Sequence, residues 1–158
     1  VHSDRETLET AVKKGAFARG FKQQVIVPEG LSGTVETLLL QRLTGLLGMG
    51  KKAGDIVLGF DQVRDALQKK RPGLLLEAAD GAEDGRSKVY FLAKALYSNV
   101  KMAGALSSEE LGVAFGRERV IHGLVRKGPI AKATELAYQR LAGFRARPEL
   151  DWFPDQDR

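Results

Sequence analysis

The sequence predicts an α/β protein, a three-layer α-β-α sandwich around a four-stranded mixed sheet, with an additional helical segment at its N-terminus. Between residues 34 and 143, short apolar runs alternate with amphipathic helical patterns, an order that places helices on both faces of one sheet. The 158 residues suffice for one ordinary domain. Hydrophobic residues make up 43% of the chain and aromatic residues only 7%, so aliphatic side chains must fill most of the core.

The chain is expected to divide into three parts. Residues 1–33 are predicted to hold a basic helix over 4–21, and then an extended piece with a turn over 24–33 that contains proline and glycine. Residues 34–143 are predicted to form the sandwich domain. Residues 144–158 form a polar, proline-containing tail, which is interpreted as either a docked or a loose end.

The first helix of the sandwich is predicted to begin at Thr34, a suitable N-cap residue. Behind it, apolar residues recur at spacings of three and four, which predicts one buried helix face. They are Val35, Leu38, Leu39, Leu43, Leu46 and Leu47. The helix is expected to end within the glycine-containing segment 45–50.

The remaining elements are predicted to alternate along the chain. They are a strand at 55–59, a helix at 60–70, a strand at 74–79, a helix at 86–97, a strand at 99–104, a helix at 107–116, a strand at 119–125 and a helix from Pro129 to Gly143. The helix at 107–116 has the clearest boundaries. Ser107 and Glu110 match a capping box, and Gly116 is suited to ending the helix.

The segment GLLGMGKK, residues 45–52, approaches the pattern of a phosphate-binding loop. Gly45, Gly50 and Lys51 fit, whereas Lys52 stands where a serine or threonine would bind magnesium. Such a loop also follows a strand and opens a helix, but this segment is predicted to lie at the end of one. Nucleotide binding is therefore disfavoured, and the glycines are interpreted as sites of close packing and helix termination.

Charge and composition narrow the classes of function. The formal net charge is +5 and the pI is about 9.6, which favours an anionic partner, most commonly nucleic acid. The absence of cysteine excludes disulfides, thiolate zinc sites and cysteine nucleophiles. There is no apolar run of the roughly 18 residues that a membrane span requires and no signal-peptide pattern. We expect a cytoplasmic location without membrane association. Because the chain starts at Val1 rather than methionine, we expect it to lack a piece at its front.

The sequence offers little for catalysis. It contains no nucleophile-elbow motif and no pair of histidines at metal-binding spacing. His122 lies in an apolar strand and is interpreted as a hydrogen-bonded structural residue. Asp80 and Asp84 are candidates for a cation site, but a solvated turn is the preferred interpretation. We therefore expect no enzyme activity, no cofactor and no metal site.

Basic residues gather in three places along the sequence. They are Lys51, Lys52 and Arg64; then Lys69, Lys70 and Arg71; and then Arg117, Arg119, Arg126, Lys127 and Lys132. Such clusters either neutralise phosphates of a nucleic acid or are solvated helix ends, where cations complement the helix dipole. For a single cluster the second reading is preferred. Convergence of several clusters on one face would favour binding.

Two stretches carry a resemblance to a known family. LTGLLGMGKKAGDIVLGFDQVRDALQKKRPGLLLEAADGA and LSSEELGVAFGRERVIHGLV resemble the kink-turn RNA-binding superfamily of ribosomal proteins, of the L-seven-Ae and L-thirty-e type. The resemblance covers about residues 36–143, and the order of motifs carries it. A Lys-Ala-Gly tripeptide is followed by Gly59 opening a helix, a hydrophobic strand ending in Asp80, and Glu110-Leu111-Gly112. The family fold is an α-β-α sandwich, in agreement with the predicted elements.

The resemblance implies RNA contacts where the second helix of the sandwich begins. The family pattern there is glycine, any residue, asparagine or lysine, glutamate or glutamine, two residues, then lysine. Gly59 and Gln62 match it, whereas Asp61 and Asp65 place acids where the family faces RNA, and Arg64 is expected to compensate. The residues expected around this site are Lys51, Lys52, Gly59, Phe60, Asp61, Gln62 and Arg64.

A second contact implied by the resemblance is the loop before the helix at 107–116. It contains Gly104, Ala105 and Leu106, whose small residues would let an RNA backbone approach. Two readings of Leu106 stay open. It either packs on an exposed base or forms a hydrophobic staple at the helix cap.

The first thirty residues are similar to the tail of the YlxR family, through the stretch DRETLETAVKKGAFARGFKQQV. Residues 1–33 are thus interpreted as the remnant of a YlxR-like domain and a linker. The resulting hypothesis is a non-catalytic bacterial RNA-binding protein of translation or RNA processing. It would recognise structured RNA, ribosomal or otherwise non-coding, by shape and backbone, with the ribosome or RNA-processing proteins as partners. The alternative, motivated by Asp61 and Asp65, is a protein-interaction module that has lost RNA binding.

Overall fold

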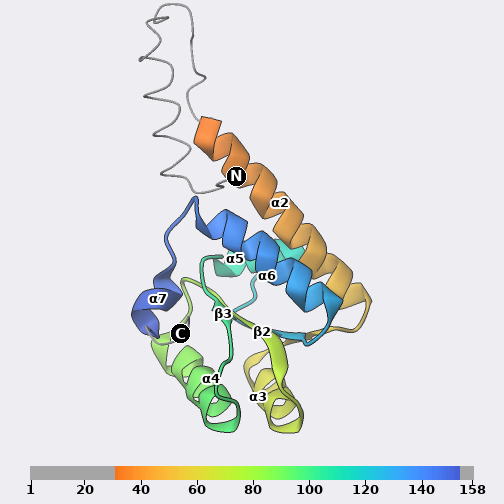
Figure 1. The fold of residues 1–158 in the computed structure, drawn as a ribbon, viewed down its shortest axis with the longest axis vertical. Helices are drawn as coiled ribbons and strands as arrows, with labels where there is room; N and C mark the ends of the chain where they lie inside the picture. The colour runs from red at the N-terminus through yellow and green to blue at the C-terminus, as the bar shows by residue number, and fades with distance from the viewer. Residues whose placement is uncertain (1–30, 154–158) are drawn as a thin grey trace, which may run out of the picture.

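Three layers make up the part of the chain that the computed structural model describes, residues 31–153 (Figure 1). In chain order the elements are α2 (Leu31–Lys52), β1 (Ile56–Leu58), α3 (Phe60–Lys69), β2 (Pro72–Glu77), α4 (Glu83–Leu96), β3 (Met102–Ala103), α5 (Ser108–Phe115), β4 (His122–Arg126), α6 (Pro129–Ala142) and α7 (Pro148–Trp152). Helices α2, α5 and α6 cover one face of the sheet, and α3 and α4 cover the other. The predicted α-β-α sandwich is confirmed.

The four strands lie in the order β1-β4-β2-β3. Strand β4 is antiparallel to both β1 and β2, and β3 is parallel to β2. Strands β1, β2 and β3 therefore run in the same direction and finish at one end of the sheet, which we call the carboxyl end. Helices α3, α4 and α5 each follow one of these strands, so all three begin at the carboxyl end. The opposite end, where the three strands start, is the amino end.

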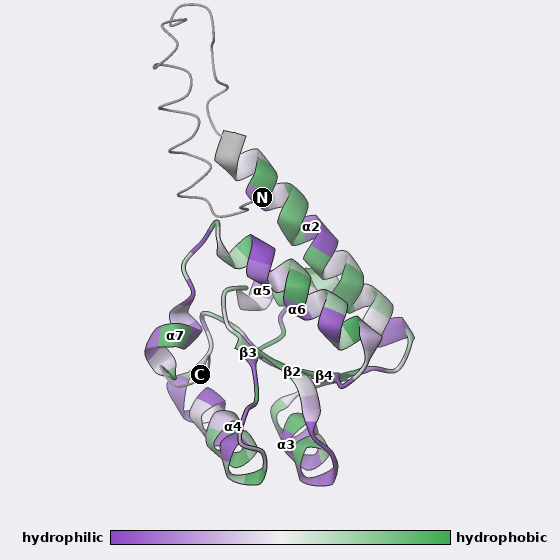
Figure 2. Ribbon diagram, viewed as in Figure 1, coloured by the Kyte–Doolittle hydropathy of each residue, from purple (hydrophilic) through white to green (hydrophobic). Residues whose placement is uncertain are grey.

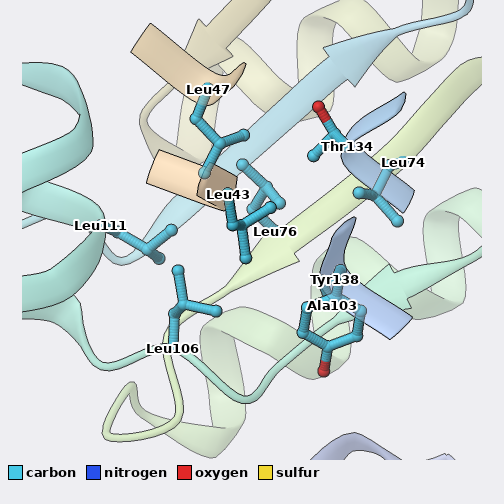
Figure 3. Close-up of a pocket in the computed structure, with 9 residues that line it drawn as sticks. All are labelled: Leu43, Leu47, Leu74, Leu76, Ala103, Leu106, Leu111, Thr134 and Tyr138. Carbon is cyan, nitrogen blue, oxygen red and sulfur yellow. The ribbon is translucent and has the colours of Figure 1, made fainter. Parts of the chain in front are cut away.

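Side chains of β2 alternate between two cores, as the pleat of a strand requires. Leu74 and Leu76 pack with the layer of α2, α5 and α6, whereas Leu75 packs with Val63 of α3 and Val89 of α4. Helices α2, α3 and α6 carry both hydrophobic and hydrophilic residues (Figure 2), as expected for helices with one buried face. The first core retains a small cavity of about 10 Å³ (Figure 3).

Helix α2 differs from the prediction at both ends. It begins at Leu31, so Thr34 lies inside the helix instead of capping it, and residues 31–33 are helical instead of extended. It also continues through the glycines to Lys52, and Gly54 follows with a positive φ of 80°. Close packing is found at two of the glycines. A Cβ at Gly48 would lie 3.4 Å from the Ala114 backbone oxygen, and one at Gly50 would lie 3.1 Å from the Ile130 side chain.

The predicted apolar face of α2 is only partly buried. Leu43 and Leu47 are buried, and Leu39 and Leu46 pack partly against the core. Leu38 is 60% exposed. The main contacts of α2 are with α5, α6 and β1, and Leu38 lies outside them.

Other boundaries moved by a few residues. Helix α4 starts at Glu83 instead of residue 86, and its first turn carries two acids, which the positive end of the helix dipole favours. Strand β3 has only two residues. Strand β4 starts at His122, and the backbone N–H of Val120 before it donates to the carbonyl of Ser108 outside the ladder. The capping box is confirmed. Ser107 Oγ accepts from the N–H of Glu110 at 3.1 Å.

The expected tail over 144–158 contains the short helix α7, which docks on the domain. Phe153, which ends this segment, is 5% exposed and its ring stacks on Tyr90 with centroids 3.8 Å apart. None of the helices in residues 31–153 has the length and hydropathy of a membrane span. The helix predicted over 4–21 lies outside the described residues.

Candidate nucleic-acid interface

The start of α3 lies at the carboxyl end of the sheet and is organised by Gly59. Gly59 has a φ of 104°, which favours glycine, and its N–H donates to the carbonyl of His122 at 3.0 Å. A Cβ at this position would lie 2.4 Å from Oε1 of Gln62. The absent side chain thus leaves space for the exposed Gln62 amide to fold over the start of the helix.

Phe60 and Arg64 form a second part of the same helix start. The half-buried Phe60 ring lies 5.4 Å from the His122 ring, centroid to centroid. The Arg64 guanidinium lies 5.3 Å from the centroid of Phe60, within the range of a cation–π contact. Nε of Arg64 is buried and has no hydrogen-bond partner within residues 31–153. Phe60 therefore holds the Arg64 cation at the start of α3.

Acids occupy the first turns of all three helices that begin at the carboxyl end. Asp61 is exposed in α3, and the others are Glu83 and Asp84 in α4 and Glu109 and Glu110 in α5. Asp65, the second unexpected acid of α3, forms an ion pair with Lys69 at 3.0 Å along the same helix. Of the two acids that depart from the family pattern, Asp65 is thus partly neutralised.

The loop 104–106 lies at the same end of the sheet, but its residues are buried. The N–H groups of Gly104 and Ala105 donate to the Tyr138 hydroxyl at 3.1 Å each. Leu106 is 4% exposed and lines the small cavity beside Leu111 of α5 (Figure 3). This is the hydrophobic staple, since the two residues flank the first turn. Leu106 therefore offers no open surface to a base.

Lys51 and Lys52 do not join these residues. They form the last turn of α2, which precedes β1, whereas Gly59 follows β1. A three-residue strand separates them by about 10 Å along the sheet. Nζ of Lys51 donates to the carbonyl of Phe115 at the end of α5, at 2.8 Å. The two lysines therefore lie at the amino end, and the contacts expected around one helix start are divided between both ends of the sheet.

Residues 41–134 match the family model described as the ribosomal protein L7Ae/L30e/S12e/Gadd45 family. The chain belongs to this family. The resemblance to the L-seven-Ae and L-thirty-e type is thereby confirmed over residues 41–134, and kink-turn binding stays a prediction. The similarity of the first thirty residues to YlxR lies outside both the matched and the described residues, and stays a prediction.

Solved structures with similar folds include two of low sequence identity. One is a Bacillus halodurans protein of unknown function, 20% identical, with a TM-score of 0.55, over 62% of this chain and 97% of that one. Another is a Giardia lamblia 15.5 kD RNA binding protein, 15% identical, with a TM-score of 0.48, over 67% of this chain and 89% of that one. A search of curated proteins gives no match.

In this L7Ae/L30e-family chain, a buried ionisable pair lies behind the start of α3. Nδ1 of His122 lies 2.8 Å from Oε1 of Glu77, so the hydrogen bond expected for His122 is present. Glu77 is 1% exposed. Burial raises the pKa of the Glu77 carboxyl, and the contact with His122 acts in the opposite direction. Sequence reasoning missed Glu77, although a lone acid in the apolar run LLLEAA was a visible sign.

Asp80 lies in an exposed turn after β2, in agreement with the preferred interpretation, and its carboxylate also binds the start of α5. Its carboxylate accepts from the N–H of Ser108 at 2.7 Å and from the Ser108 hydroxyl at 2.8 Å. These hydrogen bonds lower the pKa of Asp80, with a smaller contribution from Arg119 at 3.4 Å. No group of three or more potential metal-ligating side chains occurs within residues 31–153.

Helix α7 covers the loop 104–106, and sequence reasoning missed its anchor. Glu149 is fully buried and accepts hydrogen bonds from the Tyr138 hydroxyl and from Arg147. Burial and the neighbouring Glu149 raise the pKa of Tyr138, which keeps the phenol protonated as a donor. The ring of Trp152 lies 4.0 Å from the guanidinium of Arg86 in α4. The tail thus joins both helical layers at the carboxyl end.

Proposed function

We propose that this chain is a non-catalytic protein that binds structured RNA, with direct contacts from the start of α3. Membership of a ribosomal protein family supports this. The observation that carries the proposal is the exposed Gln62 amide, folded over a glycine at a helix N-terminus. An amide beside free backbone donors is suited to phosphate and base contacts. Folded RNA is recognised largely through such shape and backbone contacts.

Gln62 and Arg64 are proposed as the direct contacts, and Gly59 and Phe60 as the residues that position them. The Asp61 carboxylate lies at the same surface and repels RNA phosphates. Gly104, Ala105 and Leu106 are proposed to support this surface from behind through Tyr138, because all three are buried. The setting that we propose is translation or RNA processing in a bacterial cytoplasm, with ribosomal or other non-coding RNA and their associated proteins as partners.

The test is fluorescence anisotropy of the chain with a labelled kink-turn stem, a plain duplex and a single strand, at low and near-physiological salt. We expect the kink-turn stem to bind most tightly and to remain preferred over the other two RNAs at the higher salt. Gln62→Ala should weaken that complex about tenfold, as loss of a hydrogen bond to a charged group does. Gln68→Ala, on the exposed far end of α3, is the matched control. Equal, salt-sensitive binding of all three RNAs would contradict specific recognition.

The alternative function is a protein-interaction module on the same fold. The exposed acids Asp61 in α3, Glu83 in α4 and Glu109 in α5 favour it, since they repel phosphate and attract basic protein surfaces. Affinity capture with the full chain distinguishes the two. Partners that are lost after nuclease treatment support RNA binding, whereas partners that persist after nuclease and at high salt support the alternative.

A further inference from the structure

A cleft of about 160 Å³ opens at the amino end of the sheet, away from the start of α3. Its charged lining residues are Lys70, Arg71, Arg126, Lys127 and Asp55. Ala66 and Leu124 add apolar surface. Four cations against one carboxylate give the cleft a net positive charge, in contrast to the acidic helix starts at the carboxyl end.

Strand pairing brings these cations together from distant parts of the sequence. Lys70 and Arg71 follow the end of α3, whereas Arg126 is the last residue of β4 and Lys127 comes directly after it. Pro72 of β2 pairs with Arg126 of β4 in the antiparallel ladder. Two residues from each of two basic clusters seen in the sequence therefore converge on one face, the condition that favours binding over isolated solvated helix ends.

The two arginines are held in place, and the two lysines are exposed. Arg71 donates to the carbonyl of Asn99 and lies 5.8 Å from the Tyr97 ring, and Nε of Arg126 donates to the carbonyl of Gly54 at 3.3 Å. A guanidinium has five N–H donors, so donors remain on both. Across residues 31–153, no carboxylate forms an ion pair with any of the four cations.

We propose that this cleft binds phosphate groups of an RNA backbone, as a second contact separate from the start of α3. The inference rests on the proposed function. Lysine and arginine side chains on a groove supply the sequence-independent, salt-dependent part of RNA affinity. Here that part is placed at the amino end of the sheet, because the carboxyl end carries acids in the first turn of each helix that begins there.

The surroundings of the cleft favour a polymer over a small phosphate compound. Nucleotide phosphates are usually cradled by backbone N–H groups of a glycine-rich loop. The nearest such sequence, residues 45–52, is helical and contributes nothing to the lining. Side-chain cations from separate elements suit successive phosphates of a chain. Helix α3 is about 15 Å long, so an RNA stem can contact both ends of the sheet.

The experiment removes the two exposed lysines without disturbing the held arginines. The variant Lys70→Ala with Lys127→Ala is compared with Lys88→Ala with Lys94→Ala, which removes the same charge from exposed positions of α4. A third variant, Lys70→Arg with Lys127→Arg, keeps the charge. Anisotropy is measured with the kink-turn stem and the plain duplex, from about 50 to about 200 mM salt.

The slope of the logarithm of RNA affinity against the logarithm of salt concentration should become shallower by about 1.8 when two phosphate contacts are lost. We therefore expect the affinity ratio of wild type to cleft variant to fall about tenfold across that salt range. The α4 control should stay within about twofold of wild type, and the arginine variant should keep the wild-type slope. A cleft variant that matches the α4 control overturns the proposal. RNA that fails to bind the wild-type chain overturns both this proposal and the proposed function.

Two further measurements distinguish failure of the cleft proposal from failure of the proposed function, and RNA binding in the cleft from binding of small phosphates. If Gln62→Ala abolishes preference for the kink-turn stem while the cleft variant binds like wild type, only the cleft proposal fails. Amide NMR of the full chain, titrated with RNA and separately with inorganic phosphate, identifies the source. The proposal is supported if RNA changes the amide chemical shifts of Arg71, Arg126 and Lys127 and if inorganic phosphate does so only at millimolar concentration. Saturation by micromolar phosphate overturns it.

Discussion

At the residue scale, Thr134 places a hydroxyl among apolar side chains. It is fully buried, lines the small cavity with Leu43, Leu74 and Tyr138 (Figure 3), and its Oγ1 has no hydrogen-bond partner among the residues that the structure describes. A cavity of about 10 Å³ is at the lower limit of what a water molecule needs. No side chain or backbone group of residues 31–153 compensates for the burial of this hydroxyl, and such burial costs free energy of folding.

Replacing Thr134 by valine should remove that cost while keeping the branched shape. We expect Thr134→Val to raise the free energy of unfolding by about 1 kcal/mol, the size of an uncompensated buried hydroxyl in mutational data. Urea unfolding followed by circular dichroism measures it. Thr37→Val, whose exposed hydroxyl bonds to the Gly33 carbonyl, is the control and should change stability by less than about 0.5 kcal/mol. A destabilised Thr134→Val would mean that a water in the cavity bonds to the hydroxyl.

A second prediction at this scale concerns Asp61. Its exposed carboxylate lies in the first turn of α3, where the helix dipole would otherwise attract a phosphate. Asp61→Asn should raise affinity for the kink-turn stem about threefold to tenfold at low salt, and less at high salt because screening weakens the repulsion. Anisotropy titrations measure the change. Glu118→Gln, an exposed acid on the loop before β4, should leave affinity unchanged. If Asp61→Asn does not raise the affinity, the RNA does not contact the start of α3.

At the element scale, α7 is held over the loop 104–106 by close contact. A Cβ on Gly104 would lie 2.7 Å from Cζ3 of Trp152 and 3.0 Å from Cβ of Glu149. Gly104→Ala should therefore displace α7 and lower the free energy of unfolding by about 1–3 kcal/mol, as overpacking does. Because Trp152 is the only tryptophan, its fluorescence and its quenching by acrylamide report the displacement directly.

Gly45→Ala is the matched control for that substitution. Gly45 lies exposed within α2, and a Cβ there would meet nothing within 4 Å. Alanine should stabilise the helix by about 0.5–1 kcal/mol, because glycine loses more backbone freedom on folding. Trp152 quenching should stay as in wild type. Equal stability of both alanine variants would mean that α7 moves aside without cost.

The junction of Asp80 with α5 makes one contribution to the pH dependence of stability in acid. Its pKa is lowered from the ordinary 3.8 by the bonds from Ser108, so the unfolded chain binds more protons at this site. The stabilisation is present above pH 3.8 and is lost as pH falls through the lower folded pKa. Asp80→Asn should cost about 1 kcal/mol at neutral pH and converge with wild type in acid. Urea midpoints across pH measure this, with the exposed Asp151→Asn as control. A pH-independent difference would contradict the assignment.

Elements with local signals were predictable from sequence, and those set by distant contacts were not. The capping box of α5 needs only Ser107, Glu110 and Gly116, and it was found at the predicted residues. The start of α2 was placed three residues late, because Thr34 resembles a cap but the helical backbone continues past it. Helix α7 depends on Glu149 meeting Tyr138 of α6, a pairing with no periodic pattern.

The candidate site follows the same rule. Gly59 and Gln62 are three residues apart, so a motif places them together. The separation of Lys51 and Lys52 from them follows from the direction of β1, and the burial of Leu106 follows from packing against α5. Lys70 and Lys127 come together only because β2 pairs with β4. That pairing depends on the order of strands in the sheet and not on the local sequence around either lysine. Sequence clusters identified the cations but not the face that they share.

At the scale of the whole molecule, the two ends of the sheet carry different parts of the proposed RNA surface. The carboxyl end supplies directional groups at the start of α3, and the amino end supplies charge around the cleft. Gln62 and Lys70 are about 12 Å apart along α3, beyond the range at which substitutions usually couple. If one RNA contacts both ends at once, each end contributes its own increment to one binding free energy.

Losses from Gln62→Ala and from Lys70→Ala with Lys127→Ala should therefore add. We expect the triple variant to match the sum of the two within about 0.5 kcal/mol of binding free energy, with one RNA bound per chain. Anisotropy at fixed salt and a stoichiometric titration test this. The alternative is that RNA binds one end at a time in two different poses. Gln62→Ala and the double lysine variant would then each keep one intact pose and lose little binding free energy, whereas the triple variant would lose far more than the sum of the two losses. That excess would exclude a single RNA spanning both ends of the sheet.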